Sequence, residues 1–405
     1  MLGGTRAVAR CAALGRAPYS DRTDGLYRGW LTPAFRIARE QVAAWMVEAG
    51  MTVRTDAATN LIGRYEGTGD GPPLIIGSHL DSVRDGGFYD GPLGVMLGIE
   101  CVAAQTRRPP FAIEVIAFGD EEGSRFPAAM LTSKALAGVL GDVPDMADRD
   151  GVTLAAALGG FGAAPERMVE ARHPGALAYL EAHIEQGPVL EAEGLALGVV
   201  TGIAAQLRFA VVVTGQAGHA GTCTMPLRRD ALTGAAEMVL AIETIAREAN
   251  SDLVATVGRL EALPGAANVI PGEVRFTIDV RSGDAARRDR AAETIRVALP
   301  AIAVRRGLTL SIEPVHDLPA SPCDPGLMTL LEAALVDAGH PARRLVSGAG
   351  HDAMVMAALA PVAMLFMRCR EGISHNPAEH VEPADAEAAL TVMLGFIAKL
   401  GDSCA

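Results

Sequence analysis

The sequence predicts an α/β protein whose mostly parallel sheet is interrupted by a smaller α+β insert. The chain has 405 residues, more than one small core usually needs, so about two domains are expected. Short apolar segments alternate with helical segments near both ends of the chain, the rhythm of a mostly parallel α/β sheet. Between these parts the order changes to β-α-β-β-α-β, the split βαβ plan. We therefore expect a domain built from residues 1–206 and 318–405, with an insert at 207–317.

The first α/β segment follows residues 1–30, which are weakly patterned and are interpreted as a frayed arm. Apolar residues at helical spacing predict an amphipathic helix from Thr32 that is stopped by Gly50. A pair of strands comes next, and strands then alternate with a helix. In order, the expected elements are strands at Thr52–Arg54, Leu61–Tyr65 and Leu74–Ile76, a helix at Gly91–Arg107, and strands at Ile113–Phe118 and Leu177–Glu185.

The insert and the second α/β segment follow from the same patterns. Within the insert we expect strands at Arg208–Thr214, Val254–Leu260, Glu273–Val280 and Leu308–Val315, and helices at Leu227–Ala249 and Asp284–Val304. The α/β alternation then resumes with a helix at Leu327–Ala338, a strand at Pro361–Met367 and a helix at Ala384–Leu400.

Composition excludes several classes of protein. A formal net charge of −13 argues against a nucleic-acid surface, which needs a basic footprint. The six cysteines contain no C-x-x-C pair, which fits a reducing compartment better than a disulfide framework. No apolar run approaches the roughly 18 residues that span a bilayer, and the N-terminus lacks the apolar core of a signal peptide. We expect a cytoplasmic protein with no membrane or nucleic-acid partner.

The stretch from Leu74 to Asp90 joins a buried strand to polar residues at its end. Side chains two apart on an extended chain face the same side, so His79 and Asp81 can face one site. The Gly86-Gly87 pair is expected to let the backbone double back and bring Asp90 beside His79. Open α/β sheets hold their chemistry at such strand ends. Taken alone, the stretch fits a polar strand end with a surface turn equally well.

Imidazole and carboxylate side chains recur at or just past the strand ends. Such a mixed set suits zinc, manganese or cobalt rather than calcium, which prefers oxygen ligands. Two ions about 3.5–4 Å apart share a bridging carboxylate, and Asp90 is well placed for that role. Each histidine alone could be structural, but the convergence of several strand ends favours a metal centre. The candidate ligands are His79, Asp90, Glu122, His183 and His375.

Glu121 and Glu122 follow an apolar strand directly, so their side chains are expected to point to opposite sides. One can then bind metal while the other faces a water molecule. Repulsion between the two anions raises the proton affinity of the one that does not bind metal, as a general base requires. Asp81 is expected to hold the second ring nitrogen of His79. The alternative is a solvated acidic loop.

A set of motifs resembles the zinc-dependent peptidase M20 superfamily, and more narrowly its hydantoinase/carbamoylase branch. That branch contains allantoate amidohydrolases, N-carbamoyl-L-amino-acid hydrolases and β-ureidopropionases. The resemblance extends from about Thr32 to Leu400, with the motifs in the expected order. The motifs are GSHLDSV, GGFYDGPLGV, GDEEGSRF, HIEQGPVLE, GHAGT, NVIPG with IDVR, GAGHDA and GISHNPAEH.

The resemblance implies a role for each candidate residue. One ion would be held by His79, Asp90 and His183, and the other by Asp90, Glu122 and His375. Glu121 would be the general base, and the ions would be zinc or manganese, with cobalt or nickel as alternatives. The insert would be a lid and the interface of a homodimer, in which His219 reaches the partner's site and stabilises the oxyanion. The implied substrate-binding residues are Gln186, Arg208, His219, Asn268 and Arg281.

The resemblance also implies the reaction. The enzyme would hydrolyse a linear, non-peptide C–N bond in a small ureido- or carbamoyl-bearing carboxylic acid. We favour allantoate, which would give ureidoglycine, ammonia and carbon dioxide; an N-carbamoyl-L-amino-acid hydrolase or β-ureidopropionase is the alternative. A non-catalytic relative would lack Glu121 or a metal ligand, and all of them are present. A dipeptidase of the superfamily would usually carry an acid where this chain has His183.

Overall fold

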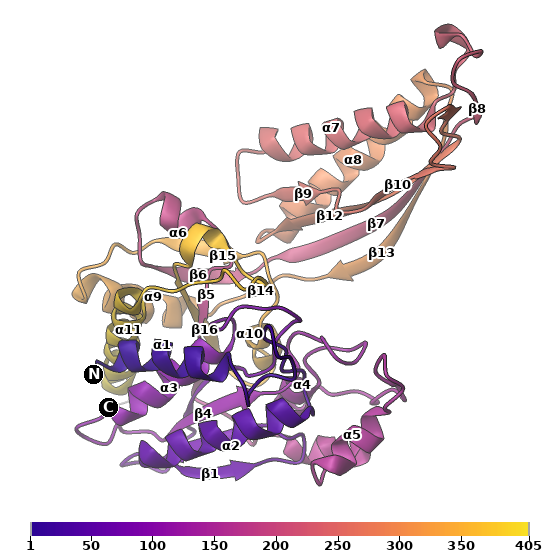
Figure 1. Ribbon diagram of the computed structural model, residues 1–405. Helices are drawn as coiled ribbons and strands as arrows, with labels where there is room; N and C mark the ends of the chain where they lie inside the picture. Colours follow the sequence, from indigo (N-terminus) through magenta and orange to yellow (C-terminus); the bar gives the residue numbers. More distant parts are fainter. Residues whose placement is uncertain (1, 404–405) are drawn as a thin grey trace. The chain divides into compact units, whose positions relative to one another are not determined.

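The computed structural model describes residues 2–403, which form two compact units. Unit 1 comprises the chain up to Thr201, Cys323–Leu345, and the chain from Ala349 onward. Unit 2 comprises Gly202–Pro322 together with Val346–Gly348. The short segment Val346–Gly348 was not expected to belong with the insert. Each unit is described separately below, and Figure 1 labels their elements.

Unit 1 is built on a mixed sheet, in which β14 and the last residues of β6 and β15 are counted with unit 2. Its strands lie in the order β1-β2-β4-β3-β5-β16-β6-β14, with β15 beside β6. The four strands β4, β3, β5 and β16 pair in parallel, whereas β1, β2, β6 and β14 pair with antiparallel neighbours. The strands are β1 (Thr52–Thr55), β2 (Leu61–Tyr65), β3 (Leu74–His79), β4 (Ile113–Phe118), β5 (Ala178–Ile184), β6 (Leu197–Ile203), β14 (Ser321–Pro322), β15 (Arg344–Ser347) and β16 (Val362–Met367).

The expectation of a mostly parallel sheet is therefore wrong at both edges. Parallel neighbours need a crossover of a dozen or more residues, and the few residues between β1 and β2 allow only an antiparallel pair. At the other edge, β6, β14 and β15 were not predicted. The central strands β3, β4, β5 and β16 are buried along their whole length, which explains their continuous apolar runs.

The frayed arm expected at residues 1–30 is also wrong. Gly3–Leu14 forms helix α1, whose buried face is Gly4, Ala7, Val8, Cys11 and Leu14. This face packs against α3 (Pro92–Ala103) and α11 (Pro383–Ser403). The other helices of unit 1 are α2 (Pro33–Glu48), α4 (Leu131–Ala137), α5 (Leu154–Gly160), α6 (Val189–Ala192), α9 (Pro325–Asp337) and α10 (Asp352–Met356), with 3₁₀ turns at Pro165–Ala171 and Arg370–Gly372.

Unit 2 contains a five-stranded sheet in the order β10-β12-β7-β13, with β9 beside β12, and each pair is antiparallel. The strand expected at Val254–Leu260 is two strands, β9 and β10. The elements are β7 (Ala205–Thr214), β8 (Gly218–His219), a 3₁₀ turn (Met225–Leu227), α7 (Ala231–Glu248), β9 (Val254–Thr256), β10 (Leu260–Leu263), β11 (Val269–Ile270), β12 (Glu273–Ser282), α8 (Ala285–Arg305) and β13 (Thr309–Leu318).

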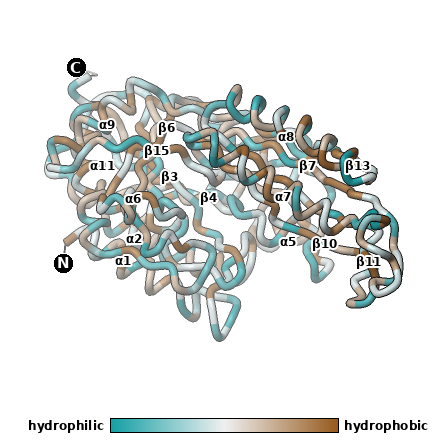
Figure 2. The backbone as a smooth tube through the Cα atoms, turned by 90° about the horizontal axis from the view of Figure 1, so that it is seen from above, coloured by the Kyte–Doolittle hydropathy of each residue, from teal (hydrophilic) through white to brown (hydrophobic). Residues whose placement is uncertain are grey.

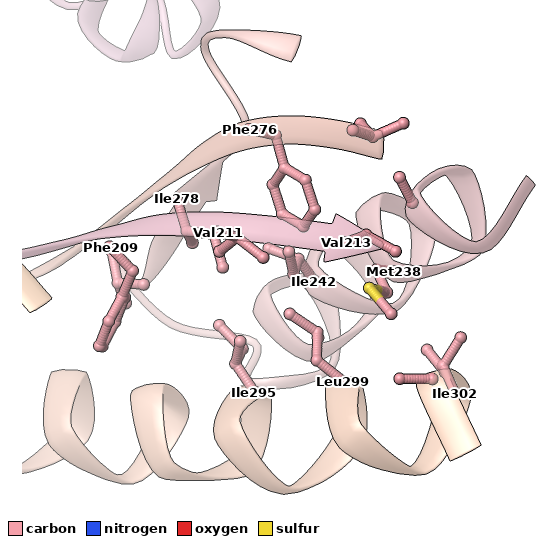
Figure 3. Close-up of a cluster of buried hydrophobic side chains, with 14 of the residues drawn as sticks. Phe209, Val211, Val213, Met238, Ile242, Phe276, Ile278, Ile295, Leu299 and Ile302 are labelled. Atoms are coloured by element: carbon pink, nitrogen blue, oxygen red, sulfur yellow. The ribbon is translucent and has the colours of Figure 1, made fainter. Parts of the chain in front are cut away.

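Unit 2 has a hydrophobic core of its own. Side chains of β7 and β12, such as Phe209 and Phe276, point toward Ile295 and Leu299 of α8 (Figure 3). Hydrophilic and hydrophobic segments alternate along α7 and α8, as amphipathic helices require (Figure 2). The side chain of Asp284 caps α8 by accepting hydrogen bonds from the backbone N–H groups of Ala286 and Arg287.

Two expectations from composition can be compared with the structure. Among residues 2–403, no helix is both long and apolar enough to cross a membrane. Cys11, Cys101, Cys223, Cys323 and Cys369 are free thiols, and Cys404 lies outside the described residues.

Candidate metal centre

The expected metal ligands meet at one edge of the unit 1 sheet. His79 ends β3, His183 lies near the end of β5, and Glu122 lies in a bend beyond β4. Because β4, β3 and β5 are parallel neighbours, their carboxyl ends lie side by side. Asp90 lies just before α3, and His375 follows the 3₁₀ turn after β16. The fold thus places side chains nearly 300 positions apart in one site.

Asp90 joins two groups of three ligands. Its Oδ1 atom lies 3.4 Å from His79 Nε2 and 3.2 Å from His183 Nε2. Its Oδ2 atom lies 3.4 Å from His375 Nε2, which is also 3.4 Å from Glu122 Oε2. In each group the candidate ligand atoms lie within 4.8 Å of one another. Each carboxylate oxygen of Asp90 therefore faces a different group.

The ring nitrogens of His79 and His183 are arranged as metal ligation requires. His183 Nδ1 lies 2.9 Å from the carbonyl oxygen of Ile184, and His79 Nδ1 lies 3.1 Å from that of Asp81. A carbonyl only accepts, so in each ring Nδ1 carries the hydrogen and Nε2 offers a lone pair. His183 Nε2 is buried and has no hydrogen-bond partner among the described residues. This donor set fits a zinc or manganese ion.

Asp81 contacts both His79, as expected, and the backbone of Glu121 and Glu122, which was not expected. His79 Nδ1 donates its hydrogen bond to the main-chain carbonyl of Asp81, while the carboxylate Oδ1 of Asp81 lies 3.5 Å away. The carboxylate instead accepts the backbone N–H groups of Glu121 at 3.2 Å and Glu122 at 3.3 Å. Asp81 thus fixes the turn that presents the two glutamates.

Glu121 and Glu122 do not point to opposite sides. They lie in a bend beyond β4, where the alternation of a strand no longer applies, and ligand atoms of both lie within 4.8 Å of one another and of His79. Glu121 Oε2 is 4.0 Å from His79 Nε2. Burial raises the pKa of Glu121 well above its usual range; the His79 charge opposes this rise and the Glu122 charge adds to it.

Two residues that the sequence analysis did not assign hold Asp90 in place. Glu379 Oε1 accepts the backbone N–H of Asp90 at 3.1 Å, and Ser374 Oγ donates to Asp90 Oδ2 at 2.6 Å. Burial, followed by the charge of Asp90, raises the pKa of Glu379 to about 7. Both residues belong to the GISHNPAEH motif. Their polar side chains near His375 were the signal by which the sequence could have pointed to them.

Gln186, expected to bind substrate, also contacts Asp90. Its Nε2 atom donates to Asp90 Oδ2 at 2.9 Å and to Ser374 Oγ at 3.2 Å. Gln186 has φ +56° and His375 has φ +52°. Backbone strain of this kind clusters at functional sites, where the surrounding structure maintains it.

The glycines of the turn act differently from the expectation for Gly86-Gly87. The residues with positive φ are Asp85 at +54° and Gly91 at +83°. A Cβ atom on Gly91 would lie 2.4 Å from the His79 ring, and one on Gly87 would lie 2.2 Å from the Glu379 carboxyl group. Gly87 is therefore required by close packing rather than by a left-handed backbone.

The remaining candidates lie in unit 2 and form two groups. Arg208 on β7 and Arg281 on β12 both donate to Asp279: Arg208 Nε at 2.8 Å, and Arg281 Nε and Nη2 at 2.9 and 2.8 Å. Burial alone would raise the pKa of Asp279, but the hydrogen bonds from Arg281 and Arg208 bring it below its ordinary value. His219 and Asn268 are exposed on neighbouring segments, joined by a backbone bond from Ala220 N to Asn268 O of 2.9 Å.

Residues 75–399 match the family described as Peptidase family M20/M25/M40. This chain belongs to that family. The expected resemblance to the M20 superfamily is confirmed by a match over most of the chain.

Individual relatives indicate which kind of hydrolase within the M20 family this chain resembles. An N-carbamoyl-L-amino acid amidohydrolase from Geobacillus stearothermophilus is 40% identical over 403 residues, which cover 97% of each chain. An allantoate deiminase from Arabidopsis thaliana is 39% identical and covers 96% of this chain and 81% of its own. The crystal structure of an amidase of the hydantoinase/carbamoylase family from Burkholderia multivorans has a TM-score of 0.91 and 35% identity, covering 99% of this chain and 98% of that one.

These comparisons confirm that this M20 member is a hydrolase of the hydantoinase/carbamoylase branch. The relatives are named for both substrates that the sequence analysis kept as alternatives, N-carbamoyl-L-amino acids and allantoate.

Proposed function

We propose that this protein is an amidohydrolase that cleaves a ureido or carbamoyl C–N bond of a small carboxylic acid with two divalent ions bound. One ion would be held by His79, Asp90 and His183, and the other by Asp90, Glu122 and His375. The observation that carries the proposal is that the two oxygens of Asp90 face two different ligand groups. A pair of bound ions polarises a carbonyl group and lowers the pKa of water.

Glu121 is proposed as the general base. Its Oε2 atom lies 4.0 Å from His79 Nε2, beside the ligand groups, and its backbone N–H is held by Asp81. From this position the carboxylate takes a proton from the attacking water and returns it to the departing nitrogen. Asp81 contributes by fixing both the ring of His79 and the turn of Glu121.

Unit 2 is proposed to supply the substrate-binding residues. Arg281 has five N–H donors, and Asp279 and the carbonyl of Gly348 occupy three of them. Two donors remain for a carboxylate, in the planar arrangement that such a group accepts. Arg208 adds a second cation, Asn268 an amide for the ureido group, and His219 a donor for the oxyanion. We further propose that unit 2 is a lid and that two copies form a homodimer through it.

Among substrates we propose allantoate, which would yield ureidoglycine, ammonia and carbon dioxide. An N-carbamoyl-L-amino acid is the second candidate, because a relative with that name is similar to this chain over 97% of its length. Both substrates carry one carboxylate and a ureido or carbamoyl group, so the same residues serve either.

The test is ammonia release from the purified protein, reconstituted with zinc or manganese, on allantoate and on N-carbamoyl-L-amino acids in parallel. Glu121→Gln is expected to lower turnover by about 10²–10⁴-fold, because it removes the general base. The variant should bind metal as the wild type does, since Glu121 is not a proposed ligand. Release only from carbamoyl amino acids would exclude allantoate, and no release from either with metal bound would overturn the proposed activity.

A further inference from the structure

The N-terminal segment Leu14–Trp30, which links α1 to α2, is bonded to the loop that follows His79. Asp85 N donates to Leu26 O at 2.9 Å, and Ser82 N donates to Arg28 O at 3.1 Å. Arg28 N in turn donates to Ser82 Oγ at 2.9 Å. The segment and the loop are therefore paired backbone to backbone along the stretch that separates His79 from Asp90.

Arg28 is the centre of this contact. Its side chain is fully buried, an unusual position for an arginine, and it has no carboxylate within ion-pair distance among residues 2–403. Its donors go to main-chain carbonyls instead: Nε to Leu80 O at 2.7 Å, and Nη1 to Leu14 O at 2.7 Å and Tyr19 O at 3.3 Å. Leu80 lies between the metal-ligand candidate His79 and its neighbour Asp81. Arg28 thus fastens the end of α1 to the backbone of the site.

The same segment supports the glutamate turn. Trp30 is buried, and a Cβ atom on Gly119 would lie 2.5 Å from its indole ring, so the chain just before Glu121 rests on Trp30. Arg125 Nη1 donates to Trp30 O at 3.1 Å. Ser124 Oγ donates to Ser82 O at 2.8 Å and links the two loops to each other.

We propose that Arg28 is a positioning residue that holds the loop from Leu80 to Asp90 in the geometry needed for metal binding. The inference rests on the proposed metal centre. A buried cation surrounded by carbonyls is costly to keep. The guanidinium group is also directional, because its rigid fork of donors holds three backbone oxygens at once. Burial lowers the pKa of Arg28 to about 10, so the side chain remains a cation at neutral pH. Metal affinity, rather than stability alone, should depend on it.

The test compares zinc dissociation constants, measured by competition with a chelator well below the unfolding temperature. Arg28→Met is expected to weaken zinc binding by about 10–100-fold, the effect typical of residues that orient metal ligands. Arg28→Lys keeps the charge but loses the fork, so an intermediate loss is expected. Ser82→Ala removes only the acceptor for Arg28 N, and should weaken binding several-fold while keeping the fold.

Met46→Ala is the matched control, because it opens a cavity where α2 packs on the edge strands β1 and β2, which β4 separates from β3. It should lower the unfolding temperature and leave zinc affinity unchanged. Wild-type affinity in both Arg28→Lys and Ser82→Ala would overturn the inference, even if Arg28→Met does not fold. If the wild type binds no zinc or manganese, the proposed metal centre fails and this inference with it; normal metal binding in the variants leaves the proposed activity intact.

Discussion

Gly91, which directly follows the shared ligand Asp90, lies against the ring of the candidate ligand His79. Its φ of +83° is rare for residues with a side chain, and a Cβ atom would lie 2.4 Å from the His79 ring. Gly50 has a similar φ of +88°, but nothing lies within 4 Å of its missing side chain. Comparing the two positions separates backbone strain from the contact with His79.

We expect Gly50→Ala to lower the free energy of unfolding by about 1–3 kcal/mol, the cost of a side chain at positive φ, and Gly91→Ala to lower it by more, because its Cβ atom also meets the His79 ring. Only Gly91→Ala should also weaken zinc binding, because it displaces His79. Calorimetric titration with zinc and denaturant unfolding measure the two effects. Equal zinc affinity in both variants would show that the His79 contact has no part in binding.

Single residues could be foreseen from the sequence where the signal was local. His79, Glu122 and His183 stand at or just past strand ends, so a pattern of apolar runs was enough to bring them together. Ser374 and Glu379 could not be assigned a role in the same way. Each acts on Asp90, more than 280 positions away, through a hydrogen bond that only the packed fold creates.

At the scale of elements, helix α1 is held to α3 by ion pairs with a buried carboxylate. Glu100 of α3 has a buried side chain and accepts hydrogen bonds from Arg6, and from Arg10 at 3.0 Å, both on α1. Removing only the partners of a buried charge destabilises the folded state more than removing the charge and its partners together, because the remaining charge stays desolvated. The docking of α1 should therefore depend strongly on these arginines.

We expect the double variant Arg6→Met/Arg10→Met to lower the free energy of unfolding by about 3 kcal/mol, less if solvent screens Arg6, whose side chain is 40% exposed. Adding Glu100→Gln should recover part of that loss, because the stranded charge is removed. Urea unfolding measures both. Arg167→Met, which breaks only the exposed pair with Glu170, is the control and should cause no measurable change. Additive losses in the triple variant would contradict this account.

The elements that the sequence predicted well are those with strong periodicity. Ile113–Phe118 was predicted with its observed bounds, and α2, α7, α8 and α11 within a few residues. The helix α1 was missed because Gly3, Gly4 and two arginines mask its apolar face, and the face is fixed by tertiary contacts with α3 and α11. Strand directions at the edges of the sheet were missed because periodicity carries no information about pairing.

For the whole molecule, the separate cores of the two units suggest separate responses to metal. The candidate ligands all lie in unit 1, and unit 2 has its own buried cluster. A ligand that binds only the folded state of one unit stabilises that unit alone, by about 2.7 kcal/mol at a hundredfold excess over Kd. Both tryptophans of the chain, Trp30 and Trp45, belong to unit 1, so tryptophan fluorescence reports on that unit.

We therefore expect a chelator to lower the midpoint temperature of the unfolding transition seen by tryptophan fluorescence. A second transition, seen by far-ultraviolet circular dichroism, should keep its midpoint temperature. Phe276→Ala is the reciprocal variant, because it removes a buried ring from the core of unit 2 and should cost about 3–5 kcal/mol there. Phe276→Ala should lower the midpoint temperature of the second transition and leave that of the fluorescence transition unchanged. If both probes move together under the chelator and in Phe276→Ala, the two units unfold as one cooperative block, and metal bound in unit 1 stabilises the whole chain.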